Sequence, residues 1–229
     1  MTFDFTFSEI LILDQIHPRK HYSGREIVIQ KPSTGSNEGQ WIALEGTVTV
    51  VPDGPLPSNI HGIPVIPWLS APSSDDGWNS YAASQDDFSE PPMVVQENKR
   101  SAAGAIIIEV NGWVWLAHPT NQFAGYEATF PKGTVDQEYS LRATAIKECY
   151  EETGLQIRLF AWLGDFHRSA SFTRMYLAER IGGHPADMGW ETQAVSLVPP
   201  GHLLTVANSR WDQPVINAIL NFLSKRGAT

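Results

Sequence analysis

Residues 133–155 read GTVDQEYSLRATAIKECYEETGL and are the most informative part of the sequence. Ser140 is a residue type that caps the N-terminus of a helix, and Gly154 is one that ends a helix. The residues between them predict a helix over 141–153, with an apolar side made of Leu141, Ala145, Ile146 and Cys149. Because Cys149 lies among apolar residues, we expect its thiol to be buried and inert.

Three carboxylates of this predicted helix share one face. Glu148, Glu151 and Glu152 stand at positions i, i+3 and i+4, which are neighbours on a helix surface. Like charges this close destabilise an isolated helix, and a divalent cation would neutralise them. Mg²⁺ and Mn²⁺ take oxygen ligands and bridge carboxylates to phosphate oxygens. On spacing alone, a metal-binding face and an ordinary acidic surface remain equal alternatives.

The same stretch resembles the Nudix box of the Nudix hydrolases, which reads G-x5-E-x7-R-E-U-x-E-E-x-G-U, where U is an apolar residue. Tyr139 stands in place of the first Glu, and Lys147 stands in place of Arg. The other seven specified positions match, at Gly133, Glu148, Cys149, Glu151, Glu152, Gly154 and Leu155. The resemblance covers roughly residues 101–224. It implies an α/β fold, the Nudix-type α/β/α sandwich with a mixed sheet.

The resemblance implies a role for each matching polar residue. Glu148 and Glu152 correspond to direct metal ligands, Glu151 to a ligand or a holder of metal-bound water, and Gly133 to a ligand through its backbone carbonyl. Mg²⁺ is the implied cofactor, with Mn²⁺ as a substitute. Glu152 and Glu151 are the catalytic candidates. The general base stays open among three acids, which are Glu152, Glu179 and Glu191.

The two departures from the box are related. In the family, the first Glu of the box and its Arg form an ion pair that ties the loop to the helix. With Tyr139 in the chain, Lys147 lacks this usual partner. We expect either the Tyr139 hydroxyl or the Glu138 carboxylate to bind Lys147 instead. Either contact would be a weaker clamp than a bidentate pair between Arg and a carboxylate.

Basic residues near the box are candidates for substrate binding. The segment 130–133, Phe-Pro-Lys-Gly, resembles the entrance to the box in dinucleoside-polyphosphate and diphosphoinositol-polyphosphate hydrolases. In those enzymes such a lysine reaches a phosphate, which implies the same for Lys132. Arg168 and Arg174 are further candidates for an anion-binding side of the cleft, with a surface role as the alternative for each.

Together these roles imply a Mg²⁺-dependent pyrophosphohydrolase. It would cleave a diphosphate linkage in a nucleoside diphosphate linked to another moiety, such as a dinucleoside polyphosphate or ADP-ribose. The alternative is a catalytically weak or inactive Nudix-like domain that binds a nucleotide metabolite as a sensor or scaffold. Tyr139 and Lys147 favour this alternative, whereas the complete set of three glutamates favours the enzyme.

Regular elements are predicted on both sides of the box. The dipeptide Asn111-Gly112 is typical of type I′ turns and lies between two apolar runs, so it predicts a hairpin of strands 105–110 and 113–117. Further strands are expected at 127–130, 156–163, 172–178 and 194–198, and a further helix at 213–224.

An acidic N-terminal extension, residues 1–100, lies outside the resemblance. Residues 32–98 contain nine acids and no Lys or Arg. The extension is predicted to be rich in loops and short strands, at 25–30, 41–51 and 63–69, with a long loop over 70–98. The domain division is therefore 1–100 and 101–229. Three roles stay open for the extension: packing on the main domain, selecting substrate or forming a dimer, and docking a protein partner.

Composition sets the remaining expectations. The chain of 229 residues has 16 basic and 25 acidic side chains, a net charge of −9, and 42% hydrophobic residues. A globular protein without affinity for duplex nucleic acid is therefore expected. A single cysteine excludes an internal disulfide, no run of about 18 apolar residues predicts a membrane span, and residues 1–16 lack a signal-peptide pattern. We expect a cytoplasmic protein that binds a small-molecule nucleotide, as a monomer or a homodimer.

Overall fold

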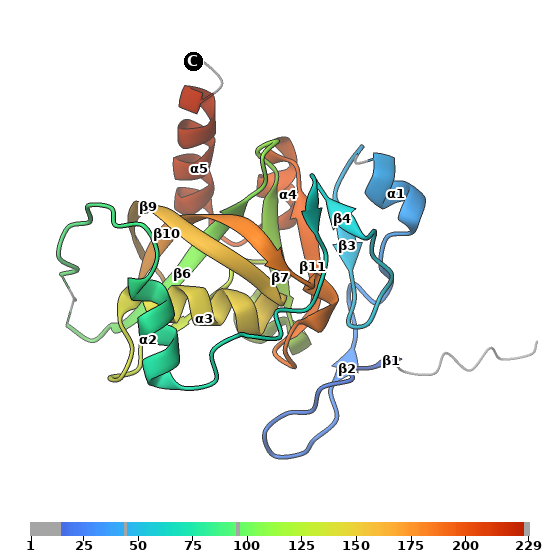
Figure 1. Ribbon diagram of the computed structural model, residues 1–229, viewed down its shortest axis with the longest axis horizontal. Helices are drawn as coiled ribbons and strands as arrows, with labels where there is room; N and C mark the ends of the chain where they lie inside the picture. The colour runs from blue at the N-terminus through green and yellow to red at the C-terminus, as the bar shows by residue number, and fades with distance from the viewer. Residues whose placement is uncertain (1–14, 44, 95–96, 227–229) are drawn as a thin grey trace, which may run out of the picture.

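A mixed seven-stranded sheet forms the centre of the computed structural model, which describes residues 15–43, 45–94 and 97–226 (Figure 1). Six strands lie in the order β3 (Val48–Val50), β11 (Thr192–Val198), β7 (Val114–Pro119), β6 (Arg100–Ile108), β10 (Ser171–Gly183) and β9 (Leu155–His167), and β8 (Lys132–Thr134) pairs with β6. The β6 and β10 strands run parallel, while the other neighbours are antiparallel.

Helices cover both faces of this sheet (Figure 1). α3 (Leu141–Thr153) packs on one face, in a buried cluster that includes Ile146 and Trp115. On the other face lie α4 (Leu203–Val206) and α5 (Gln213–Arg226), around a second cluster that includes Phe130 and Ile216. The predicted α/β/α sandwich is confirmed. Three short 3₁₀ helices complete this part, η1 (Thr120–Gly125), η2 (Pro185–Asp187) and η3 (Pro200–His202).

The bounds of α3 are those that the sequence predicts. Ser140 Oγ accepts a hydrogen bond from Ala143 N at 3.1 Å, which caps the first turn. Gly154 ends the helix with a φ of 67°, and a Cβ there would overlap the carbonyl oxygen of His184. The Cys149 thiol is free and fully buried, as expected.

The predicted hairpin of β6 and β7 is confirmed, but the predicted turn type, I′, is wrong. A type I′ turn needs a positive φ at both central residues. Here Gly112 has a φ of 84°, whereas Asn111 is not among the residues with positive φ. Gly112 N donates a hydrogen bond to Glu109 O at 2.8 Å, so the turn spans residues 109–112.

The strand predicted at 127–130 is also wrong. This segment makes one isolated bridge, between Ala117 and Thr129, because it crosses from β7 to β6 and pairs with β6 only from Lys132 onward. The later elements are confirmed with longer bounds than expected, as β9, β10, β11 and α5 show.

The extension contains a helix where the sequence predicts a loop. α2 (Asp75–Ala83) lies within residues 70–98. Ser74 Oγ accepts a hydrogen bond from Gly77 N at 3.2 Å and caps this helix. Trp78 and Ala82, one turn apart, are buried on its inner side. The many polar residues around these two positions conceal the helical pattern in the sequence.

The strands predicted in the extension are too long. Part of 41–51 belongs to α1 (Glu38–Ala43), where Trp41 is buried against Trp115 with ring centroids 6.1 Å apart. The strand that the structure has in this range is β3, which is three residues long. The other two regions keep two-residue strands, in the pairs β1 (Gln15–Ile16) with β2 (Val28–Ile29) and β4 (Asn59–Ile60) with β5 (Ile63–Pro64). Because β3 pairs with β11, the extension packs on the main domain.

Two expectations concern targeting. Among the described residues, no helix is both long enough and apolar enough to cross a membrane. The expected absence of a signal peptide falls mainly on residues 1–14, which lie outside the described residues.

A buried histidine at the end of β7 predicts a loss of stability in acid. His118 Nδ1 lies 2.9 Å from Glu127 O, so this nitrogen donates, and Nε2 accepts from the Ser196 hydroxyl at 2.7 Å. Burial lowers the pKa of His118 from 6.5 to about 4. The unfolded chain therefore takes up this proton near pH 6.5 and the folded protein only near pH 4, so falling pH favours unfolding in that window.

Between pH 7 and pH 4.5 we expect the wild type to lose about 2–3 kcal/mol more unfolding free energy than His118→Gln, which keeps the polar contacts without the titration. Urea denaturation at the two pH values measures the difference. Equal losses in both proteins would contradict the assignment of a buried neutral imidazole.

Candidate active site

The C-terminal half of α3 faces β8. Gly133, in β8, pairs with Ala103 of β6. The carboxyl group of Glu148 packs directly against Gly133, and a Cβ at residue 133 would overlap that carboxyl group. Any larger residue would therefore displace Glu148. The structure thus brings together two of the predicted metal ligands.

Glu152 lies one helical turn after Glu148 and turns to the same place. Its Oε2 accepts a hydrogen bond from Lys132 N at 3.1 Å. Burial raises the pKa of Glu152 to about 8, the charge of Lys132 opposes this shift, and the charge of Glu148 adds to it. Burial also raises the pKa of Glu148 to about 7. Two neighbouring, largely buried carboxylates are unfavourable as anions, and a divalent cation would stabilise them.

Glu151 is engaged elsewhere. Its Oε2 lies 2.5 Å from Lys147 Nζ in an i,i+4 ion pair, and its side chain is 44% exposed. Within the part of the chain that the structure describes, no three His, Cys, Asp or Glu side chains are grouped closely enough to hold a metal ion. The metal set therefore stays a prediction, with Gly133, Glu148 and Glu152 together and Glu151 held by Lys147.

The three base candidates divide into two groups. Glu191 lies just before β11. Its pKa is raised mainly by burial and also by the negative charge of Glu151. Its own charge contributes to the raised pKa of both Glu148 and Glu152. Glu179, on β10, binds Arg158 Nε at 2.6 Å instead. Glu152 therefore lies at the site and Glu191 lies near enough for its charge to act on the box glutamates, whereas Glu179 is bound by Arg158.

Lys132 and Arg168 are linked by a chain of hydrogen bonds through Thr129 and Asp212. Lys132 Nζ donates to Thr129 Oγ1 at 3.0 Å, and Thr129 Oγ1 donates to Asp212 Oδ1 at 3.3 Å. The same Asp212 oxygen accepts from Arg168 Nη1 at 2.5 Å. Arg168 Nε, Arg168 Nη2 and Asp212 Oδ2 are buried without a hydrogen-bond partner. Arg168 and Asp212 are 3% and 0% exposed, whereas Lys132 is half-buried beside Glu152, so Lys132 is the basic residue of this cluster that an anionic ligand could reach.

The family follows from a match to known proteins. The family model of the NUDIX domain matches residues 98–218, more than half of the chain. The chain belongs to the Nudix family. The expectation of a Nudix hydrolase, which acts on phosphoric anhydride bonds, is thereby confirmed at the level of the family. No curated protein sequence matches the chain.

Solved Nudix structures are similar in fold. An Ap4A hydrolase from C. elegans is 18% identical with a TM-score of 0.46, over 56% of this chain and 99% of that protein. An ADP-ribose pyrophosphatase from Streptococcus suis is 18% identical with a TM-score of 0.44, over 53% and 90%. A MutT protein from Methanosarcina mazei is 15% identical with a TM-score of 0.46, over 57% and 98%. These likenesses concern the fold and say nothing about the substrate of this chain.

Tyr139 and Lys147, the two residues that depart from the Nudix box, make contacts that differ from both expectations. The Tyr139 hydroxyl donates a short hydrogen bond to Asp75 Oδ1 of α2, not to Lys147. Lys147 lies over the Tyr139 ring, 5.7 Å from its centroid, and pairs with Glu151. Among the described residues, the ion-pair partners of Lys147 are Glu151 and, at 3.9 Å, Glu148, and Glu138 is not one of them. Both expectations considered contacts within residues 133–155, whereas the partner comes from the extension.

Arg174, the third basic residue expected to bind substrate, is occupied by carboxylates. Its Nε and Nη2 bind the two oxygens of Asp165 at 2.7 Å each, and its Nη1 binds Glu90 Oε2 at 2.9 Å. It is 1% exposed. The structure therefore brings Lys132 and Arg168 together and leaves Arg174 in a separate ionic network.

Sequence reasoning missed several polar residues around the Nudix box. Asp212 precedes the C-terminal helix, a position that signals a helix cap but no particular partner. Asp75, Asn79 and Glu90 belong to the extension, whose acidic composition gave no indication of a contact with residues 133–155.

Proposed function

We propose that this Nudix protein is a metal-dependent pyrophosphohydrolase. The observation that carries the proposal is the placement of Glu148 and Glu152, two largely buried carboxylates, against Gly133 and beside Lys132. Neither carboxylate pairs closely with a cationic side chain: the nearest ion pair of Glu148, to Lys147 Nζ, is 3.9 Å long. A hard divalent cation matches this donor set.

The chemistry of these donors fits such a cation, because Glu148 and Glu152 are neighbouring oxygen donors without a close cationic partner, and Glu151 would have to leave Lys147 to complete the set. Glu148 and Glu152 would hold it, with the carbonyl of Gly133 and with Glu151 directly or through water. Mg²⁺, or Mn²⁺ in its place, supplies charge neutralisation on the phosphate oxygens when bound. Glu151 is available for this role because its pair with Lys147 is partly exposed and therefore weak.

The chain's own residues supply the remaining functions. Glu152 or Glu191 would take the proton from the attacking water, because burial raises the pKa of both carboxyl groups and so makes each a stronger base than an exposed glutamate. Lys132, which is half-buried, would bind the phosphate chain, and Arg168, buried behind it and paired with Asp212, would add positive charge. Arg174 has no direct part in this proposal, because Asp165 and Glu90 already bind it.

The proposed substrate is a nucleoside diphosphate linked to another moiety, such as a dinucleoside polyphosphate or ADP-ribose. Purified protein would be incubated with Mg²⁺ and ADP-ribose, diadenosine polyphosphates, nucleotide sugars and nucleoside triphosphates, and the products separated by chromatography. We expect cleavage of one class at a phosphoric anhydride bond. Binding of a nucleotide without cleavage of any compound would contradict the hydrolase proposal and support the alternative, a Nudix-like domain that binds a nucleotide as a sensor.

A further inference from the structure

The extension forms hydrogen bonds with the loop that joins β8 to α3. Asn79, on α2, spans two backbone groups that flank Tyr139: its Nδ2 donates to Glu138 O at 2.7 Å, and its Oδ1 accepts from Ser140 N at 2.9 Å. Ser140 is also the N-cap of α3. A single amide side chain therefore fixes the end of the loop and the beginning of the helix.

A second contact from α2 holds the residue between these two groups. The Tyr139 hydroxyl donates to Asp75 Oδ1, one turn before Asn79 on the same helix. Tyr139 stands at the position where the Nudix box has Glu, and Lys147 stands where it has Arg. Since Lys147 pairs with Glu151, no ion pair within the box ties this loop to α3.

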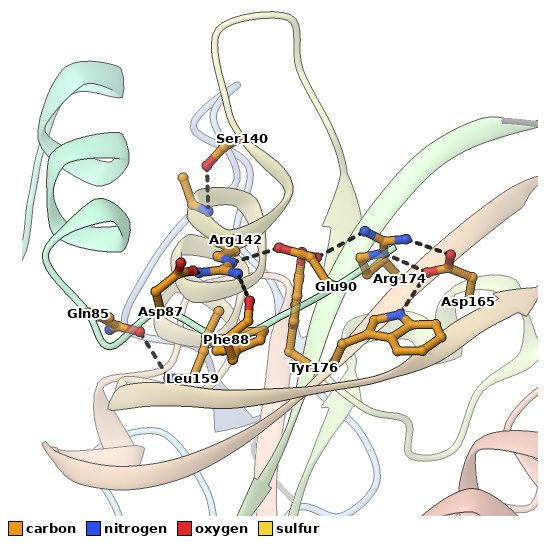
Figure 2. Close-up of polar contacts among 12 residues, drawn as sticks. Gln85, Asp87, Phe88, Glu90, Ser140, Arg142, Leu159, Asp165, Arg174 and Tyr176 are labelled. Atoms are coloured by element: carbon orange, nitrogen blue, oxygen red, sulfur yellow. Dashed lines mark hydrogen bonds and ion pairs between the residues drawn. The ribbon is translucent and has the colours of Figure 1, made fainter. Parts of the chain in front are cut away.

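The segment after α2 holds the first turn of α3. Arg142 Nε binds Glu90 Oε1 at 2.7 Å, Nη1 binds Asp87 at 3.1 Å, and Nη2 donates to Phe88 O at 2.7 Å. The Phe88 ring stacks under the guanidinium, 3.9 Å from it. Figure 2 shows these groups around Arg142, with Tyr176 next to Glu90 and with Arg174 and Asp165 on the far side of Glu90.

The helix that provides these contacts is itself firmly anchored. Trp78 is 4% exposed and packs edge-on against Trp68, with ring centroids 5.7 Å apart. Tyr150, on the outer side of α3, contacts both rings. Glu90 is fixed in turn by Arg174 Nη1 and by the Tyr176 hydroxyl at 2.7 Å. The side chains that contact the loop and α3 therefore belong to a part of the extension that is itself held in place by packing and hydrogen bonds.

We propose that the extension supplies the clamp that the altered Nudix box lacks. Asp75, Asn79, Asp87 and Glu90, called here the extension clamp, are positioning residues that hold the loop 134–140 and α3 so that Glu148 meets Gly133 and Glu152 meets Lys132. The proposal rests on the proposed hydrolase function, because its consequence for turnover requires that function. It also explains why the chain keeps three box glutamates while it lacks the usual ion pair.

The test removes the α2 part of the clamp in the full-length protein. The variant Asp75→Ala/Asn79→Ala is compared with Asp76→Ala/Ser80→Ala, which changes the next residue in each case. Both control residues are exposed on the same helix, and among the described residues neither side chain forms a hydrogen bond or ion pair with the loop or α3. We expect kcat to fall roughly 10- to 100-fold in the first variant only, because misplacement of a reacting group costs rate. KM should change less than about 3-fold, and the Mg²⁺ concentration for half-maximal activity should rise.

A rescue variant separates positioning from a general loss of structure. Adding Tyr139→Glu and Lys147→Arg to Asp75→Ala/Asn79→Ala restores the ion pair of the box in a chain without the clamp. We expect kcat to return to within about 3-fold of the wild type. A variant that hydrolyses slowly and is not rescued would overturn the claim that the clamp replaces this pair, as would undiminished activity of Asp75→Ala/Asn79→Ala.

A measurement on the metal-free protein tests the clamp independently of turnover. The Ser140 amide donates to Asn79 Oδ1, so its hydrogen exchange should be at least about 10-fold faster in Asp75→Ala/Asn79→Ala than in Asp76→Ala/Ser80→Ala. Equal exchange rates would overturn the clamp even if the wild type is an active enzyme. If exchange accelerates but no panel compound is cleaved by the wild type, the hydrolase proposal fails and its consequence for turnover fails with it.

Discussion

Glu152→Gln is expected to lower kcat roughly 100- to 10,000-fold while leaving the fold intact. The change removes the negative charge of one proposed metal ligand and the proton-accepting ability of a base candidate, and general-base catalysis contributes a factor of this size. The amide still accepts the hydrogen bond from Lys132 N. Steady-state kinetics on the cleaved panel compound, at saturating Mg²⁺, measures the loss.

Glu179→Gln is the matched control for this variant. It makes the same chemical change in a glutamate that pairs with Arg158 on the exposed surface of β9 and β10. We expect its kcat to stay within about 2-fold of the wild type, since surface pairs contribute little. Similar losses in both variants, or full activity of Glu152→Gln, would remove Glu152 from the proposed catalytic set.

The largest effect on stability is expected at Glu109→Gln. Glu109 and Arg180 form an ion pair whose side chains are 0% and 1% exposed, with Nε and Oε1 2.5 Å apart. Trp115 Nε1 donates to the same carboxylate at 2.7 Å. His61, from the extension, lies 3.0 Å from its other oxygen. Loss of the negative charge leaves the Arg180 cation buried and uncompensated.

We therefore expect Glu109→Gln to lower the free energy of unfolding by about 3–5 kcal/mol, measured by urea denaturation. The exposed pair of Lys20 and Glu26 provides the control, because both side chains are more than half exposed. Glu26→Gln should change the free energy by less than about 0.5 kcal/mol. A loss below about 1 kcal/mol for Glu109→Gln would mean that other groups or water compensate Arg180.

The Nudix half of the fold could be predicted because its signals are local. Ser140 and Gly154 mark the ends of α3 through capping chemistry that involves only adjacent residues, and the structure gives the predicted bounds. The hairpin of β6 and β7 follows from two apolar runs around a Gly turn, although the positions of positive φ depend on how many residues the turn spans. Such features need no knowledge of distant contacts.

The extension was harder to predict because its structure depends on distant residues. α2 has only two buried residues, Trp78 and Ala82, and its inner side is defined by Trp68 and Tyr150. Its acidic composition left docking of a protein partner open beside packing on the main domain. Several of these acids instead bind basic residues of the Nudix domain, through the pairs Asp86–Arg158, Asp87–Arg142, Glu90–Arg142 and Glu90–Arg174.

In the candidate site, too, the residues set by local sequence could be predicted, whereas those that depend on distant partners could not. The box glutamates and Lys132 could be named from the spacing of residues 130–155, and the structure brings Glu148, Glu152 and Lys132 together. Arg168 and Arg174 have similar positions in sequence, yet Asp212 holds one near the site and Asp165 and Glu90 hold the other apart from it. Sequence spacing carries no information about which carboxylate each arginine meets.

The most direct test of the proposed catalytic centre is the dependence of hydrolysis on Mg²⁺. Initial rates on the cleaved panel compound would be measured over a range of Mg²⁺ concentrations, after removal of metal with EDTA, for the wild type and for Glu148→Gln. We predict negligible activity without metal, saturable activation of the wild type, and a much higher Mg²⁺ requirement for the variant, whose altered side chain packs against Gly133. Full activity of the metal-free wild type, or identical Mg²⁺ curves for the two proteins, would contradict the account.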